Sequence, residues 1–157
     1  MSAPGQGTTF EVYLPTASPD EVASPLVGAG APEAARILIV DDDSKVAKAL
    51  ARVATALGHQ VTITLDPHDA IARVQHGEHF DLVLTDWQMP ALSGVELARV
   101  IRAARRDLPV VVMTGGLPEL PADLRKDVGV SLLPKPITRD QLSRHLASRL
   151  GGVSTKV

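Results

Sequence analysis

The sequence of 157 residues contains no cysteine. This excludes a disulfide framework and a thiolate metal site, and it is typical of a reducing compartment. No apolar run approaches the roughly 18 residues that span a bilayer. The N-terminus also lacks the basic and then apolar pattern of a signal peptide. Basic residues do not outnumber acidic ones, because the formal net charge is −2, so no basic surface indicates nucleic-acid binding.

These absences predict a cytoplasmic chain that contacts neither nucleic acid nor a membrane directly. A longer parent protein anchored in a membrane remains compatible with them. The apolar fraction of 45% is normal for a globular domain with a real core. The sequence does not indicate an oligomeric state.

The chain divides into four parts by composition. Residues 1–15 contain a β-like run with Phe10, Val12 and Leu14 at alternate positions, and a lone strand is not stable in water. Residues 16–35 are rich in Ser, Pro, Gly and Ala, which is the composition of a flexible linker. We expect one domain over residues 36–150 and a short tail over residues 151–157.

Apolar runs and helical patterns alternate from Arg36 onward. Strands are predicted at residues 37–40, 61–65, 80–85, 110–113 and 130–133, and helices at 44–57, 67–75, from 93, at about 121–128 and from 138. Ser44 and Ser93 are predicted to cap their helices. Five β-α units with continuous apolar strands indicate an α/β fold: a doubly wound parallel sheet with helices on both faces.

The residues with chemical potential follow the predicted strands. Parallel sheets of this kind place their active crevice outside the carboxyl ends of the strands. Asp41 and Asp42 follow the first strand, Asp86 the third, Thr114 the fourth and Lys135 the fifth. We therefore expect these side chains to meet at one edge of the sheet.

Together these residue types suit an aspartate that accepts a phosphoryl group. An anion that approaches an anionic phosphoryl group needs a cation, and Mg²⁺ prefers oxygen ligands. Asp41, Asp42, Asp86 and the backbone carbonyl of Gln88 are the candidate ligands. Lys135 would supply a positive charge opposite the metal ion.

Three further expectations concern the same edge. Thr114 would donate its hydroxyl to a phosphoryl oxygen. Clustered carboxylates repel one another, so one of them is expected to hold a proton until the metal ion arrives. We also predict a cis peptide bond between Lys135 and Pro136, which turns the lysine back toward the site.

The segments around these residues resemble the receiver domain of two-component response regulators. The resemblance spans about residues 36–150 and rests on Ile37–Asp43, Asp81–Leu97, Val111–Thr114 and Leu133–Pro136. It implies a flavodoxin-like strand order 2-1-3-4-5 and a phosphorelay function. Asp86 would be the phosphoacceptor, with Asp41 and Asp42 as the Mg²⁺ pair and Thr114 and Lys135 as phosphoryl contacts.

One position departs from the family pattern. Members often carry an aromatic residue three positions before the lysine, and that residue moves inward on activation. Leu132 stands there in this chain. The aromatic form of the switch is therefore not expected, and Gly115 and Gly116 after Thr114 offer a route for loop movement instead.

The first residues have a resemblance of their own. The run from Gly5 to Pro15 resembles the glycine box and last strand of a histidine kinase ATP-binding domain. With the linker and receiver that follow, it implies the carboxyl-terminal part of a hybrid sensor histidine kinase, a transferase. The rest of an ATP site is missing, so no ATP-dependent activity is expected here. The implied partner is a histidine kinase core or a histidine phosphotransfer protein, which donates from phosphohistidine.

Two other functions fit part of the pattern. The Asp41–Ser44 run also fits the opening motif of haloacid-dehalogenase-like phosphatases, with Asp41 as nucleophile, although only Asp140 follows Lys135 as a further acid. A third possibility is an interaction module that is never phosphorylated. Turnover of a generic phosphate ester would favour the phosphatase, stoichiometric labelling the receiver, and no labelling the module.

Overall fold

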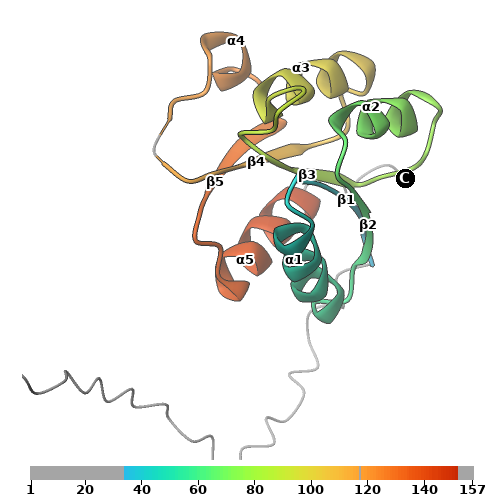
Figure 1. Cartoon of the computed structure of the whole chain (residues 1–157), viewed down its shortest axis with the longest axis vertical. Helices are drawn as coiled ribbons and strands as arrows, with labels where there is room; N and C mark the ends of the chain where they lie inside the picture. Colours follow the sequence, from blue (N-terminus) through green and yellow to red (C-terminus); the bar gives the residue numbers. More distant parts are fainter. Residues whose placement is uncertain (1–33, 117, 152–157) are drawn as a thin grey trace, which may run out of the picture. The chain divides into compact units, whose positions relative to one another are not determined.

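The computed structural model describes residues 34–116 and 118–151. Five strands and five helices alternate along this part of the chain (Figure 1). The strands are β1 (Arg36–Val40), β2 (Gln60–Thr64), β3 (Leu82–Asp86), β4 (Val110–Thr114) and β5 (Val130–Pro134). The helices are α1 (Ser44–Ala56), α2 (Pro67–Gln75), α3 (Gly94–Ala104), α4 (Ala122–Arg125) and α5 (Arg139–Leu150). The expected strand remnant at 1–15, most of the linker and most of the tail lie outside the described residues.

The strands form one parallel sheet in the order β2-β1-β3-β4-β5, so the predicted fold class and strand order are confirmed. Helices α2, α3 and α4 lie on one face of the sheet, and α1 and α5 lie on the other (Figure 1). Alternate residues of β1 point to opposite faces of the sheet and pack with the helices on each face. Leu38 and Val40 pack with the residues of α2 and α3, whereas Ile37 and Ile39 pack with those of α1 and α5.

Helix starts follow local hydrogen bonding, and one predicted cap is wrong by a residue. The carboxylate of Asp43 accepts from the backbone N–H groups of Lys45 and Val46, so Asp43 is the N-cap and Ser44 is already helical. Ser93 caps α3 as predicted, in a reciprocal capping box with Glu96. In the described residues, no helix is long and apolar enough to cross a membrane.

Helix α4 is shorter than predicted. It ends at Arg125, whereas the sequence pattern placed its end near residue 128. The carboxylate of Asp127 accepts from the backbone N–H of Gly129 at 2.9 Å and from Arg102. These contacts turn the chain out of the helix and into β5.

Candidate phosphorylation site

The predicted site residues meet at one edge of the sheet. Asp86 ends β3 and Thr114 ends β4, while Asp41 directly follows β1 and Lys135 directly follows β5. Because the four strands are parallel neighbours, their carboxyl ends share that edge. The backbone N–H of Lys135 donates to the carbonyl of Thr114 at 2.6 Å, which fixes the start of the β5–α5 loop against β4.

Lys135 joins the two buried carboxylates. Its Nζ lies 2.6 Å from Oδ1 of Asp86 and 3.9 Å from Oδ2 of Asp41. The lysine side chain is 31% exposed, whereas those of Asp86 and Asp41 are 12% and 2% exposed. The positive charge of Lys135 is therefore shared by two carboxylates that are largely buried. The Lys135–Pro136 peptide bond is cis, as predicted.

Asp41 has an unusual environment for a carboxylate. Its Oδ1 accepts from the backbone N–H of Asp43 at 2.9 Å. Its Oδ2 is buried and has no hydrogen-bond partner among the described residues. Burial raises the pKa of Asp41, and the nearby charges of Asp86 and Asp42 act in the same direction, whereas the Asp43 N–H and Lys135 oppose them. The sequence predicted a proton-holding carboxylate from repulsion, but the larger cause is desolvation.

Asp86 is held by backbone as well as by Lys135. Its Oδ2 accepts from the backbone N–H of Gln88 at 3.1 Å. The N–H of Trp87 donates to the carbonyl of Met113 at 2.8 Å, so the residue after Asp86 continues the contact with β4. The predicted role of the Gln88 carbonyl as a metal ligand stays a prediction, because the contact seen is made by its N–H.

Thr114 is buried at the same edge. Its Oγ1 accepts from the backbone N–H of Gly116 at 3.2 Å. That contact uses a lone pair of the hydroxyl and not its proton, so the O–H is still available as a donor. The contact also orders Gly116, which the sequence suggested as a point of loop movement.

Gly94 supports the site in a way that sequence reasoning missed. A Cβ at this position would collide with the backbone carbonyl of Asp86. The N–H of Gly94 also donates to the carbonyl of Trp87 at 3.0 Å. Helix α3 therefore begins against the peptide that carries Asp86, and only glycine fits there. The available signal was a glycine directly after the capping Ser93.

The donor set suits Mg²⁺ by its chemistry. All candidate side chains offer oxygen, the type of ligand that Mg²⁺ takes, and the partnerless Oδ2 of Asp41 is a buried acceptor that a cation can satisfy. In residues 34–116 and 118–151, however, no three acidic or histidine side chains converge at ligand spacing. Binding therefore requires a local adjustment of the carboxylates, and exposed Asp42 is the freest of them to make it.

An open cavity of about 450 Å³ lies beside this edge. Its lining includes Asp42, Trp87 and Gln88, together with the following turn and Ser93. Trp87 is partly buried against the α2–α3 layer of the core. The single tryptophan of the chain thus lies directly beside the acidic cluster.

Comparisons with known proteins agree with this geometry. The model of the response regulator receiver domain matches residues 37–147. The chain belongs to the response regulator receiver family. It is therefore a phosphoacceptor domain of two-component signalling, and members of this family generally bind Mg²⁺ at the acidic site.

Three relatives illustrate the match. The sensor protein EvgS of Escherichia coli K12 is 34% identical over 151 residues, which are 93% of this chain and 12% of EvgS. A chemotaxis protein CheY homolog of Campylobacter jejuni is 31% identical over 130 residues, 74% of this chain and 92% of that protein. The crystal structure of the receiver domain of the hybrid histidine kinase CckA is 28% identical with a TM-score of 0.62, covering 73% of this chain and 98% of that one.

Membership of the receiver family answers the phosphatase alternative. The phosphatase hypothesis gives no role to the segment from Asp86 to Gly94, whereas this segment lies within the matched receiver region. Leu132, at the position where many members carry an aromatic residue, is partly buried against the α2–α3 layer of the core.

Proposed function

We propose that Asp86 is the residue that accepts the phosphoryl group. The observation that supports this most directly is the position of its carboxylate, whose Oδ1 meets Lys135 at 2.6 Å and whose Oδ2 accepts from the Gln88 N–H. In the proposed step, an Asp86 oxygen attacks the phosphorus of a phosphohistidine. The phosphorus–nitrogen bond breaks and its electron pair leaves with the imidazole, so the product is an acyl phosphate.

The surrounding residues would balance the charge of this step. Asp41 and Asp42 would hold Mg²⁺ together with Asp86 and the Gln88 carbonyl, and the metal ion would neutralise charge on the phosphoryl oxygens. With three carboxylates, one divalent cation and Lys135, the shell is formally neutral before the phosphoryl group enters. Lys135 would then transfer its contact from Asp86 to a phosphoryl oxygen, and Thr114 would donate to another.

We further propose that this chain is the receiver part of a hybrid sensor histidine kinase. The alignment with EvgS covers 93% of the chain, whereas the alignment with the CheY homolog covers 74%. The longer match favours shared sequence before the receiver domain, as expected if residues 1–15 belong to a kinase ATP-binding domain. The receiver of CckA offers a precedent from a hybrid kinase.

Receiver domains interact with histidine kinases or phosphotransfer proteins. For this chain we propose a histidine kinase core or a histidine phosphotransfer protein as the donor. The cavity lined by Asp42, Trp87 and Gln88 lies beside the residue that follows Asp86 and is the proposed side of approach for the donor.

Labelling by a small phosphodonor tests the assignment of Asp86. The wild type, Asp86→Asn and the exposed control Asp140→Asn are treated with acetyl phosphate and Mg²⁺, and intact masses are recorded. We expect one phosphoryl group on the wild type and the control and none on Asp86→Asn. Undiminished labelling of Asp86→Asn, with peptide mapping to Asp41, would move the nucleophile and revive the phosphatase mechanism.

A further inference from the structure

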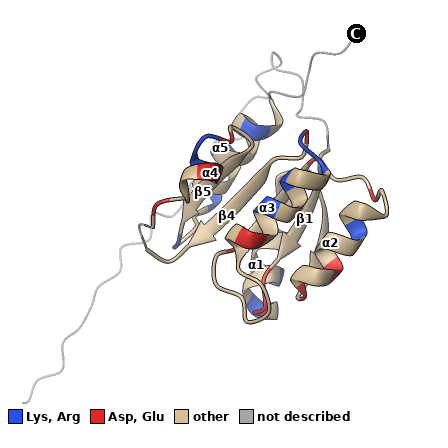
Figure 2. Ribbon diagram, turned by 90° about the horizontal axis from the view of Figure 1, so that it is seen from above, with Lys and Arg blue, Asp and Glu red and all other residues tan. Residues whose placement is uncertain are grey.

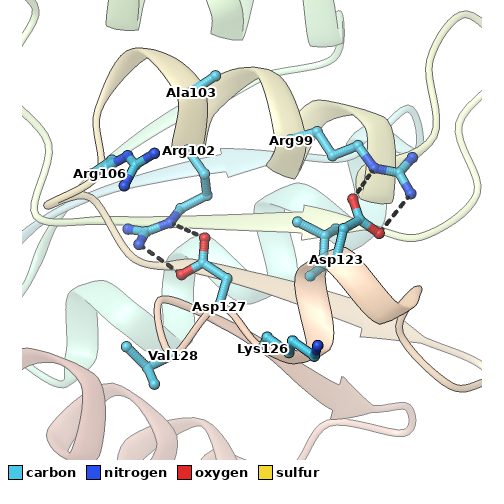
Figure 3. Close-up of a pocket in the computed structure, with 9 residues that line it drawn as sticks. Arg99, Arg102, Ala103, Arg106, Asp123, Lys126, Asp127 and Val128 are labelled. Atoms are coloured by element: carbon cyan, nitrogen blue, oxygen red, sulfur yellow. Dashed lines mark hydrogen bonds and ion pairs between the residues drawn. The ribbon is translucent and has the colours of Figure 1, made fainter.

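The carboxyl edge of the sheet, where Asp41, Asp86 and Lys135 meet and where phosphorylation is proposed, is called the phosphorylation edge below. A second charged region lies away from it. An open cavity of about 490 Å³ is formed by α3 and by the segment from α4 to β5 (Figure 3). Its charged lining consists of Arg99, Arg102, Arg106, Asp123, Lys126 and Asp127. Both signs of charge occur on α3 and α4 (Figure 2). Arg106 precedes β4, and Asp127 and Val128 precede β5. The cavity therefore extends toward the amino ends of the strands, whereas Asp86 lies at the carboxyl end of β3.

Two of the arginines are already paired. Arg102 binds Asp127 through two hydrogen bonds of 2.9 and 2.7 Å and donates to the carbonyl of Leu108 at 3.0 Å. Arg99 binds Asp123 in the same two-pronged manner at 2.7 and 3.2 Å. These hydrogen bonds are the largest cause that lowers the pKa of each carboxylate. Both pairs are therefore ionised and mutually neutralised at neutral pH.

Two cations of the cavity have no such partner. In the described part of the chain, neither Arg106 nor Lys126 has an ion pair or a side-chain hydrogen bond. Figure 3 shows them on opposite sides of the cavity, Arg106 beyond α3 and Lys126 beyond α4. With four cations and two carboxylates in its lining, the cavity carries a formal charge of +2, although the whole chain carries −2.

The cavity also offers an apolar contact. Val128 is 88% exposed and is one of the two exposed large hydrophobic residues in the described part of the chain. It lines the cavity together with Ala103 and Leu124. The open cavity of about 490 Å³ has room for a small organic group beside an anion.

We propose that this α3–α4 cavity binds the dianionic group of a small phosphate ester. Arg106 and Lys126, on opposite sides of the cavity (Figure 3), supply its surplus positive charge. The free N–H groups of Arg99 and Arg102 are the hydrogen-bond donors for the phosphate group. A dianion cancels the surplus of +2, whereas a monoanion leaves half of it. The organic part of the ester lies against Val128, Ala103 and Leu124.

The test is an NMR titration of the ¹⁵N-labelled full chain at constant ionic strength. EDTA replaces Mg²⁺, so that the Asp86 site has no metal ion to hold phosphate. The probes are phenyl phosphate, inorganic phosphate and benzenesulfonate, a monoanion with the same ring. We expect saturable shifts confined to residues 99–107 and 122–129, strongest with phenyl phosphate, weaker with inorganic phosphate and weakest with benzenesulfonate.

Two variants and a matched control locate the site. Arg106→Gln and Lys126→Gln each remove one unpaired charge and should weaken phenyl phosphate binding roughly threefold, as for the loss of one exposed charge near the anion. Arg52→Gln is the control, because Arg52 lines a separate cavity between α1 and β2. Stronger binding of inorganic phosphate than of the ester would limit the site to the free anion and remove the apolar part of the proposal.

Other outcomes overturn the proposal. Shifts centred on residues 41–43, 86–88 and 135 would place the anion at the phosphorylation edge. Equal effects of all three probes, or equal losses in Arg52→Gln and Arg106→Gln, would show general charge screening. Labelling of Asp86 by acetyl phosphate is independent of every one of these results, so the two proposals fail separately.

Discussion

At the carboxyl edge of the sheet one lysine serves two buried carboxylates, whereas between α3 and α4 each of two carboxylates has an arginine of its own. Lys135 lies 2.6 Å from Asp86 and 3.9 Å from Asp41. Asp123 and Asp127 are each held by two hydrogen bonds from a guanidinium group. The first region lacks positive charge and the second has a surplus of it.

This difference matches two different roles. The Lys135 contact has to be exchanged when a phosphoryl group binds, whereas the two arginine–aspartate pairs hold parts of the fold together. A planar guanidinium fits a carboxylate with two hydrogen bonds and fixes its orientation, whereas an ammonium is a point charge on a flexible stem. A lysine can therefore pass from one oxygen to another with little rearrangement. The arginine pairs instead attach the segment from α4 to β5 to α3.

The largest expected effect on stability is that of Gly94→Ala at the phosphorylation edge, and Gly129→Ala in the second region is its comparison. Gly94→Ala places a methyl group against the backbone carbonyl of Asp86, which cannot rotate away. We expect a loss of about 3 kcal/mol in the free energy of unfolding, at the upper end of overpacking costs, together with slower phosphorylation. Urea unfolding followed by circular dichroism measures the loss.

The matched variant is Gly129→Ala. Its new methyl group meets the guanidinium of Arg102, the far end of a flexible side chain, so the loss should be about 1 kcal/mol. Equal losses in the two variants would contradict the view that the phosphorylation edge is supported by rigid backbone and the second region by side chains.

The next effect lies within the arginine pairs. Arg102→Ala removes a side chain that is 12% exposed and leaves Asp127, 25% exposed, without its partner. We expect a loss of about 2 kcal/mol, somewhat less than for a fully buried pair. Arg99→Ala removes a pair that is 44% and 54% exposed, so its effect should be clearly smaller. Thermal unfolding of both variants in low and high salt checks this, because only the Arg99 pair should be sensitive to screening.

The sequence predicted the phosphorylation edge better than the second region, for a physical reason. Parallel strands deliver their last residues to one edge, so Asp41, Asp86, Thr114 and Lys135 could be grouped from strand ends alone. The Arg102–Asp127 contact joins residues 25 positions apart through side chains on α3 and a loop. No periodicity reports which arginine meets which aspartate.

Smaller errors have local causes. Both Asp43 and Ser44 are good cap residues, and only the structure shows that the Asp43 carboxylate accepts from Lys45. The end of α4 was misplaced because Asp127 turns the chain through its contact with Gly129. The pattern of apolar residues carries no information on such side-chain to backbone bonds.

The smallest expected effect concerns the buried charge of Asp41. Its pKa is raised in the fold, chiefly by burial, above the ordinary value of 3.8. The folded state therefore holds a proton that the unfolded state has lost, and the free energy of unfolding falls as pH rises from about 3.8 through the folded pKa. Asp41→Asn removes this dependence and keeps the acceptor for the Asp43 N–H. In EDTA at neutral pH we expect the variant to be more stable than the wild type by roughly 1 kcal/mol, with no difference at acidic pH.

With Mg²⁺ we expect the wild type to be more stable than Asp41→Asn. The buried negative charge of Asp41 destabilises the metal-free wild type, but it binds the metal ion when Mg²⁺ is present. At ten times its dissociation constant a bound cation stabilises by about 1.4 kcal/mol, and the neutral amide introduced by Asp41→Asn is a weaker ligand than the carboxylate. The emission of Trp87 follows binding in the wild type and in the variant, and urea unfolding with and without Mg²⁺ gives the two stabilities. If Mg²⁺ stabilised Asp41→Asn as much as the wild type, the unpartnered oxygen of Asp41 would not be part of the metal site, and the shortage of positive charge at this edge would have to be met by Lys135 alone.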